Sequence, residues 1–356
     1  MTSRERTLTQ LTGGVPDRIA RTDSPWSETI RRWRQEGLGE EEDVGRRFGF
    51  DLAGIGGCDT SLRLPTETIE DCDEYCIHRD ANGVLRKDFK RDSGHTPQWL
   101  EHTIKTPEDW FEHKERLVPC DERVDKEKLP KQYAELRERD LFIHFTHTEA
   151  YEMSWPVWGQ VGIFTTMMDR PDVIEDVFKT YTDLIIALAQ NVLDLGVDFD
   201  GAWFWGDLGY RNSQLFSPAL YDQLLFPHHQ RMCRFFNDLG KPVILHSCGR
   251  IQELIPRFIE AGFAAIQPLE AKANQDVREL KKIFGNQIVF FGNIDIRTMS
   301  TTKEAIEEEM RTKITAAKEG GGYIYHSDHS VPPTVSWENY QFVMECVDRF
   351  GNFDGA

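Results

Sequence analysis

His246 and Cys248 carry the clearest chemical signal in this sequence, because they stand two positions apart at the end of an apolar run, PVILHSC (242–248). Residues i and i+2 of a β-strand point to the same face, so the imidazole and the thiol would converge on one point. Imidazole and thiolate are preferred zinc ligands. The pair therefore predicts a metal site. The same pattern also fits a buried cysteine that only packs, or a nucleophilic Cys248 activated by a histidine.

His329 is the best candidate for a third ligand, since it follows the last apolar run, GYIYHSD (322–328). Asp328 stands beside it and would serve as a ligand or as the acceptor that orients an imidazole. The sequence thus predicts a metal held by His246, Cys248 and His329, with a fourth position open to substrate, as in catalytic zinc sites.

Three carboxylates are candidates for catalysis: Asp207, Glu152 and Asp328. Asp207 lies among aromatic residues in WFWGDLGY, where burial would raise its pKa and suit it to proton transfer. A helix cap or a loop hydrogen bond is the alternative role for Asp207. Glu149 and Glu152, in THTEAYEMSW, would reach the same site, although one of the two is expected to be an ordinary surface acid.

A pocket for substrate is predicted from polar and aromatic residues near the ends of several apolar runs. Its expected members are His147, Glu149, Trp205, Tyr210, Gln267 and Asn293. Aromatic residues such as these also form protein cores, so both roles stay open for them. His228 and His229 are expected to be an exposed part of a helix interrupted by Pro227.

Repeated β/α units position these residues. Six short apolar runs alternate with amphipathic helices, at 141–147, 200–207, 242–248, 263–269, 287–295 and 322–328, and each ends in polar residues. This pattern predicts a parallel sheet covered by helices on both faces. Two further strands from the first 140 residues would close a barrel, and a doubly wound sheet is the alternative. Both place the site at the carboxyl ends of the strands.

The N-terminal part is less regular. Residues 26–38 and 106–117 have helical spacing with good caps, and Asn82-Gly83 between two strand-like runs predicts a hairpin. The sequence therefore predicts a helical and hairpin extension before the main repeat.

Composition excludes several classes of protein. The 356 residues carry a formal charge of −18, which disfavours nucleic-acid binding. No stretch approaches the roughly 20 apolar residues of a membrane span, and the N-terminus has no secretory h-region. Seven scattered cysteines suit free thiols in a reducing compartment. These features predict a cytoplasmic protein.

Four segments in order resemble the uroporphyrinogen decarboxylase superfamily: SPALYDQLLFPHHQRM, KPVILHSCGRIQELIPRFIEAG, VFFGNIDIRTM and EGGGYIYHSDHSVPPTVSWENY. PDRIARTDSPWSETIRRWRQEGL through RRFGFD is similar to one branch of it. The resemblance implies a (β/α)8 TIM-type barrel. Residues 1–356 would form one domain, with the extension and first barrel elements in 1–140 and the main barrel in 141–350.

The superfamily contains two chemistries. Its decarboxylases need no cofactor and bind the carboxylates of porphyrinogens with an arginine-rich N-terminal segment, which has no counterpart here, since Arg31, Arg32 and Arg34 lie in a different frame. Its other branch comprises zinc methyltransferases with a His-x-Cys pair and a later cysteine. His246 and Cys248 match the pair, whereas His329 takes the place of the later cysteine.

The resemblance therefore implies a zinc methyltransferase that moves a methyl group between a small ether, amine or thiol and a corrinoid (cobalamin) carried by a partner protein. A cofactor-free decarboxylase centred on Asp207 and His329, or a non-catalytic ligand-binding barrel, is the alternative. The oligomeric state stays open, with a homodimer as one option.

Overall fold

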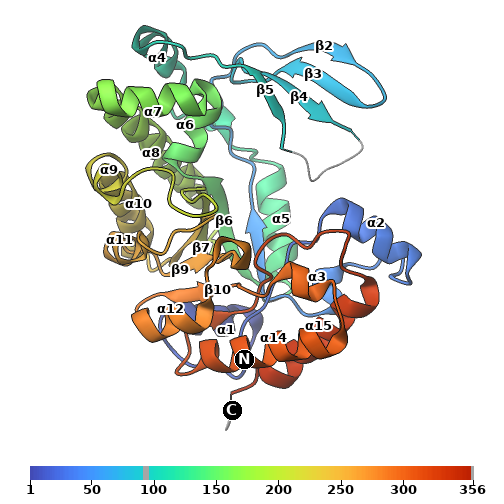
Figure 1. The fold of residues 1–356 in the computed structure, drawn as a ribbon. Coiled ribbons are helices and arrows are strands. Elements are labelled where there is room, and N and C mark those ends of the chain that lie inside the picture. Colours follow the sequence, from blue (N-terminus) through green and yellow to red (C-terminus); the bar gives the residue numbers. More distant parts are fainter. Residues whose placement is uncertain (91–95, 354–356) are drawn as a thin grey trace.

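The computed structural model describes residues 1–90 and 96–353. A parallel sheet of seven strands curls around its centre (Figure 1). In chain order and in spatial order the strands are β1 (Leu52–Ile55), β6 (Phe142–Thr148), β7 (Gly201–Trp205), β8 (Val243–His246), β9 (Ala265–Gln267), β10 (Val289–Phe291) and β11 (Tyr323–Ile324). All six predicted apolar runs therefore form strands of one sheet.

A short extended segment near Arg21 closes the ring between β11 and β1. Arg21 forms a parallel bridge with Tyr325, and Tyr325 N donates to Ala20 O at 2.9 Å. On the other side, Asp51 N donates to Arg21 O at 2.8 Å. This segment and β1 supply the two strands that the first 140 residues had to provide. The predicted (β/α)8 TIM-type barrel is confirmed, and the doubly wound sheet is excluded.

Helices cover the outside of the barrel. They are α5 (Lys128–Arg137), α6 (Ala150–Trp158), α7 (Gln160–Asp169), α8 (Pro171–Asp194), α9 (Pro218–Leu224), α10 (Phe226–Asp238), α11 (Ile255–Ala261), α12 (Val277–Phe284), α13 (Ile296–Met299), α14 (Lys303–Lys318) and α15 (Trp337–Phe350). α8 shows why they pack: Val173, Val177, Leu184 and Leu188 recur at helical spacing and are all buried. Among the described residues, no helix combines the length and apolar character needed to cross a bilayer.

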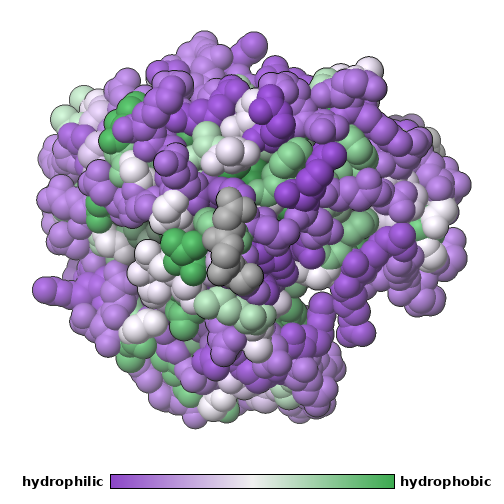
Figure 2. Space-filling model, turned by 90° about the horizontal axis from the view of Figure 1, so that it is seen from below, coloured by the Kyte–Doolittle hydropathy of each residue, from purple (hydrophilic) through white to green (hydrophobic). Residues whose placement is uncertain are grey.

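The interior of the barrel is a packed core. Alternate residues of the strands form a separate apolar cluster, which includes Phe142, Trp203, Ile244 and Phe291. Leu11 at the end of α1 (Ser3–Leu11) joins this cluster from the amino end of the barrel. Most of the surface at that end is hydrophilic, with apolar atoms in small separate groups (Figure 2). A ligand would therefore approach the strands from their carboxyl ends.

An antiparallel sheet of four strands forms the extension. It contains β2 (Glu67–Asp71), β3 (Tyr75–Arg79), β4 (Leu85–Phe89) and β5 (Gln98–Glu101), and lies apart from the barrel beside α6 (Figure 1). Asn82-Gly83 forms the predicted turn between β3 and β4, with Gly83 at a φ of +76°. Trp99 of β5 packs edge-on against Trp155 of α6, with ring centroids 5.3 Å apart. The sheet thus stands on the carboxyl side of the barrel.

The remaining helices also match the sequence pattern. The segment predicted at 26–38 forms α2 (Ser27–Gln35), and 106–117 forms α4 (Pro107–His113) followed by a 3₁₀ turn (Lys114–Arg116). α3 (Val44–Arg47) and two further 3₁₀ turns (Asp121–Arg123, Ala271–Ala273) complete the described elements.

Candidate metal centre

His246 and Cys248 converge at the carboxyl end of β8, as predicted. Cys248 Sγ lies 3.4 Å from His246 Nε2. The other ring nitrogen, Nδ1, hydrogen-bonds to Gln267 Oε1 at the end of β9. Because a carbonyl oxygen only accepts, the ring donates from Nδ1 to Gln267, and Nε2 faces both the thiol of Cys248 and Oδ1 of Asp207, at 3.4 Å from each.

Two trios of metal-ligating side chains meet at Cys248. One contains Asp207, His246 and Cys248, the other Cys248, Glu270 and His329, and within each trio the ligand atoms lie within 4.8 Å of one another. His329 therefore lies near Cys248, although not in the same trio as His246. Glu270, which directly follows the apolar run 263–269, is a further ligand candidate that was not predicted from the sequence.

Glu270 is well held beside Cys248. The side chain is buried, and Oε2 accepts a 2.7 Å hydrogen bond from the backbone N of Gly249. Oε1 lies 2.8 Å from Lys272 Nζ and 3.9 Å from His329 Nε2. The carboxylate thus faces the same point as the thiol and the imidazole.

The charges around Cys248 favour a cation. Burial raises the pKa of the Cys248 thiol well above its usual range, and the carboxylates of Asp207 and Glu270 raise it further. Burial and the nearby Lys272 lower the pKa of His329, so its imidazole is neutral at pH 7. Imidazoles, a thiol and carboxylates make a donor set that fits a divalent metal ion, which would convert the thiol to a thiolate. His246, Cys248, Glu270 and His329 are hereafter called the candidate metal centre.

The protonated carboxyl group near this centre is Glu152 rather than Asp207. Burial would raise the pKa of Asp207, but its hydrogen bonds to His246 and to the backbone N of Cys248 hold the pKa below its usual value. The predicted upward shift for Asp207 is therefore wrong. Burial and the negative charges of Asp207 and Glu149 raise the pKa of Glu152 to about 8. Glu152 Oε2 lies 3.2 Å from the backbone N of Asp207.

Glu149 and His229 form a buried pair beneath α6. Glu149 has an exposed fraction of 0% and accepts hydrogen bonds from the backbone N of Tyr151 and of Glu152, at 2.9 and 2.7 Å. His229 Nε2 lies 3.0 Å from Glu149 Oε2, and its Nδ1 bonds to the hydroxyl of Tyr221. The expectation that one of Glu149 and Glu152 is a surface acid is wrong, as is the expected exposure of His228 and His229, which are both buried.

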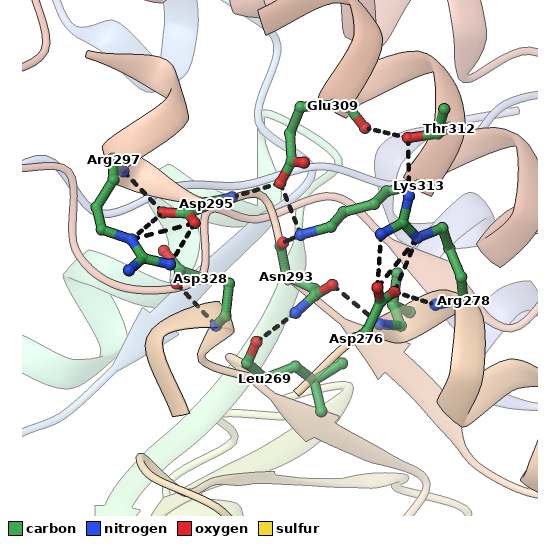
Figure 3. Close-up of polar contacts among 12 residues, drawn as sticks. Leu269, Asp276, Arg278, Asn293, Asp295, Arg297, Glu309, Thr312, Lys313 and Asp328 are labelled. Atoms are coloured by element: carbon green, nitrogen blue, oxygen red, sulfur yellow. Dashed lines mark hydrogen bonds and ion pairs between the residues drawn. The ribbon is translucent and has the colours of Figure 1, made fainter. Parts of the chain in front are cut away.

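Two predicted site residues are buried behind the centre. Asn293 and Asp328 are 0% and 1% exposed, and their side chains bond to backbone groups of neighbouring loops (Figure 3). Substrate binding by Asn293 and catalysis by Asp328 stay predictions.

Aromatic side chains flank the histidines of the centre. Trp205 packs on His246 with ring centroids 4.1 Å apart and is 38% exposed. Trp26, which was not predicted as a site residue, contacts His329 edge-on with ring centroids 6.1 Å apart. Tyr210 is 68% exposed. His147 is half-buried at the end of β6, where its Nδ1 accepts a 2.8 Å hydrogen bond from the backbone N of Thr148. Trp205 and Gln267 are thus the predicted pocket residues that directly contact the centre.

Comparison with known proteins gives one family and two activities. The family described as uroporphyrinogen decarboxylase (URO-D) matches residues 157–350. A uroporphyrinogen decarboxylase of Syntrophotalea carbinolica is 24% identical over 189 residues, covering 51% of this chain and 50% of that protein. The methylcobamide:CoM methyltransferase MtaA of Methanosarcina barkeri is 23% identical over 181 residues, again 51% and 50%. The chain spans about half the length of these curated relatives.

A solved structure matches over nearly the whole chain. A methyltransferase from Methanosarcina mazei superposes with a TM-score of 0.70 and 16% identity, covering 98% of this chain and 99% of that one. This likeness, which extends over the barrel and the extension together, supports the fold described above. Because the family match covers more than half of the sequence, the protein belongs to the uroporphyrinogen decarboxylase family, whose relatives here include decarboxylases and a methyltransferase.

Proposed function

We propose that this protein is a zinc-dependent methyltransferase that moves a methyl group between a small methylated substrate and a corrinoid carried by a partner protein. The observation that carries the proposal is the candidate metal centre at the carboxyl ends of the barrel strands, where the Cys248 thiol belongs to two trios of possible ligands, one with His246 and Asp207 and one with Glu270 and His329. The similarity to a methylcobamide:CoM methyltransferase supports it.

Three of the side chains of His246, Cys248, Glu270 and His329 would hold the zinc ion while substrate is bound, which leaves the fourth position of a catalytic zinc site to the substrate atom. When bound, zinc would supply Lewis acidity to the oxygen, nitrogen or sulfur atom that carries the methyl group. His329 would take the place that a cysteine has in the branch of the superfamily that the sequence resembles.

Glu152 is the proposed proton donor and acceptor. In the demethylation direction, the bond between methyl carbon and heteroatom breaks, the methyl group passes to the reduced cobalt of the corrinoid, and the heteroatom keeps the bonding electron pair. That atom then takes up a proton. Since its pKa is raised to about 8, the Glu152 carboxyl carries a proton at neutral pH. Burial and the nearby charge of Asp207 keep Glu152 protonated, and Trp205 would shield the substrate from water.

The arginines of α2 disfavour the decarboxylase alternative. A substrate with several carboxylates needs a cluster of cations, but an acidic side chain stands beside each of Arg31, Arg32 and Arg34, namely Glu28, Glu36 and Glu40, and offsets its charge. The net charge of −18 also opposes a polyanionic substrate.

A cobalamin absorbance assay tests the proposal. Purified protein is mixed with reduced or methylated cobalamin and a panel of methylated ethers, amines and thiols, and the wild type is compared with Cys248→Ser. The proposal expects methyl transfer by the wild type with at least one compound class, and strong loss in Cys248→Ser. Full activity of a metal-free wild type would contradict it. Conversion of uroporphyrinogen would establish the decarboxylase instead, and metal binding without any turnover would indicate a binding protein.

A further inference from the structure

We infer that Asp328 and Asn293 are positioning residues of the candidate metal centre, and that they act by fixing the backbone loops on which Cys248, Glu270 and His329 stand. The inference rests on the proposed metal site and goes beyond it, because it assigns to two buried residues a role that involves no contact with substrate.

Asp328 joins the loops that carry two of the ligands. Its Oδ2 accepts a 2.9 Å hydrogen bond from the backbone N of Ala271, the residue after Glu270. Its Oδ1 accepts one of 3.0 Å from the backbone N of Ile296 at the start of α13. The next residue along the chain is His329. One buried carboxylate therefore fixes the spacing between Glu270 and His329.

Asn293 holds both ends of the loop that contains Glu270. Its Nδ2 donates to the backbone O of Leu269 at 2.6 Å and of Gln275 at 2.8 Å, and its Oδ1 accepts from the backbone N of Val277 at 2.9 Å. Asn293 is fully buried, so its amide has no water to bond instead. Its backbone has a φ of +83°, a conformation that asparagine adopts more readily than most residues.

The loop held by Asn293 in turn fixes the backbone beside Cys248. Gln275 Nε2 donates to the carbonyl of Gly249 at 2.7 Å, and Gly249 N donates to Glu270 Oε2, also at 2.7 Å. Gly249 follows Cys248 directly. Three of the four ligands thus share one hydrogen-bonded network, whereas the side chain of His246 is oriented by Gln267.

Lys313 of α14 connects Asn293 to a helix on the outside of the barrel. Its buried Nζ donates to the backbone O of Asn293 at 2.6 Å and pairs with Glu309 at 2.6 Å (Figure 3). The position of Asn293 is therefore set by a helix on the outside of the barrel. Residues that orient ligands typically change metal affinity by about 10- to 100-fold when mutated.

The test measures metal binding in two variants and one control. Asp328→Asn puts an amide nitrogen where one backbone N–H needs an acceptor, at nearly constant volume. Asn293→Gly removes three hydrogen bonds and keeps the positive φ without strain. Asp295→Asn is the matched control: it makes the same carboxylate-to-amide change, and Asp295 bonds to the backbone N and side chain of Arg297 but, among the described contacts, not to the 269–277 loop.

Zinc affinity is measured by competition with a chromogenic chelator, and the cobalt(II) form gives an absorption spectrum that reports ligand geometry. We expect zinc binding about 10- to 100-fold weaker in Asp328→Asn and Asn293→Gly, with an altered cobalt spectrum, and wild-type behaviour in Asp295→Asn. Thermal unfolding verifies that each variant folds, and either of the two variants alone suffices for the test.

Wild-type affinity and an unchanged cobalt spectrum in folded Asp328→Asn or Asn293→Gly would overturn the inference and leave the proposed function standing. A wild type that binds neither zinc nor cobalt would overturn both. The two failures are therefore distinguishable.

Discussion

Replacing Glu149 by glutamine should destabilise the protein strongly, because the Glu149 carboxylate is fully buried and accepts three hydrogen bonds. The amide of Glu149→Gln retains one acceptor oxygen, so the NH₂ group must face the backbone N–H of Tyr151 and His229 Nε2. Hydrogen bonds to charged groups contribute about 1.5–3 kcal/mol each, and Glu149→Gln loses two of them. We therefore expect a loss of about 3–6 kcal/mol, which for a chain of 356 residues corresponds to a Tm lower by about 4–8 °C.

Calorimetry at pH 7.5 measures the effect, with Glu152→Gln as the matched control. Glu152→Gln makes the same substitution three residues away. Because the pKa of Glu152 is raised to about 8, its carboxyl is already protonated, and the Tm of this variant should differ little from that of the wild type. A double variant with His229→Leu should lose less stability than the sum of the two single variants, by about 1–3 kcal/mol, because the two side chains contact each other. A Tm of Glu149→Gln within about 2 °C of the wild type would refute the reasoning.

Three further predictions concern other parts of the structure. Gln267→Leu removes the acceptor that orients His246, so zinc affinity by chelator competition should fall about 10- to 100-fold; wild-type affinity would contradict this. Burial and the neighbouring His229 lower the pKa of His228 to about 4, so the unfolded chain binds more protons below pH 6.5 and stability falls as the pH drops towards 4. Relative to pH 8, His228 should therefore lower the free energy of unfolding by about 2 kcal/mol at pH 5. His228→Gln should show a flatter plot of Tm against pH than the wild type, and parallel plots would exclude His228 as a cause of the pH dependence. In Gly209→Ala the new Cβ would overlap the carbonyl oxygen of Cys248, so both the Tm and the metal affinity should fall. In Gly162→Ala the new Cβ has nothing within 4 Å and lies in α7, so the metal affinity should stay unchanged and the Tm should not fall.

The sequence predicted the barrel well, because its signal is local. Short apolar runs between capped helices define strands wherever they occur, and all six runs entered the sheet in order. The i, i+2 rule likewise brought His246 and Cys248 together. The closing segment at Arg21 was less predictable, since it pairs with β11 through only a single bridge. β2 and β5 were also missed, because their exposed and mixed faces carry no clear alternation.

The site was predicted less completely, since it depends on how loops cross in space. Glu270 follows an apolar run, but its approach to Cys248 depends on the bond from Gly249 N, which no local pattern reveals. His229 was expected to be exposed because two adjacent histidines in a polar stretch are typical of a surface. Its partner, Glu149, lies 80 positions away in the chain. Long-range pairs of this kind determine which polar residues are buried and which face a ligand.

X-ray absorption at the zinc edge of the purified protein would show directly which atoms bind the metal. We expect about one zinc ion per chain with a single sulfur ligand at about 2.3 Å and the remaining ligands nitrogen or oxygen at about 2.0–2.2 Å, with the sulfur contribution lost in Cys248→Ser. Two or more sulfur ligands, or a fully active wild type without bound metal, would contradict a centre built from His246, Cys248, Glu270 and His329.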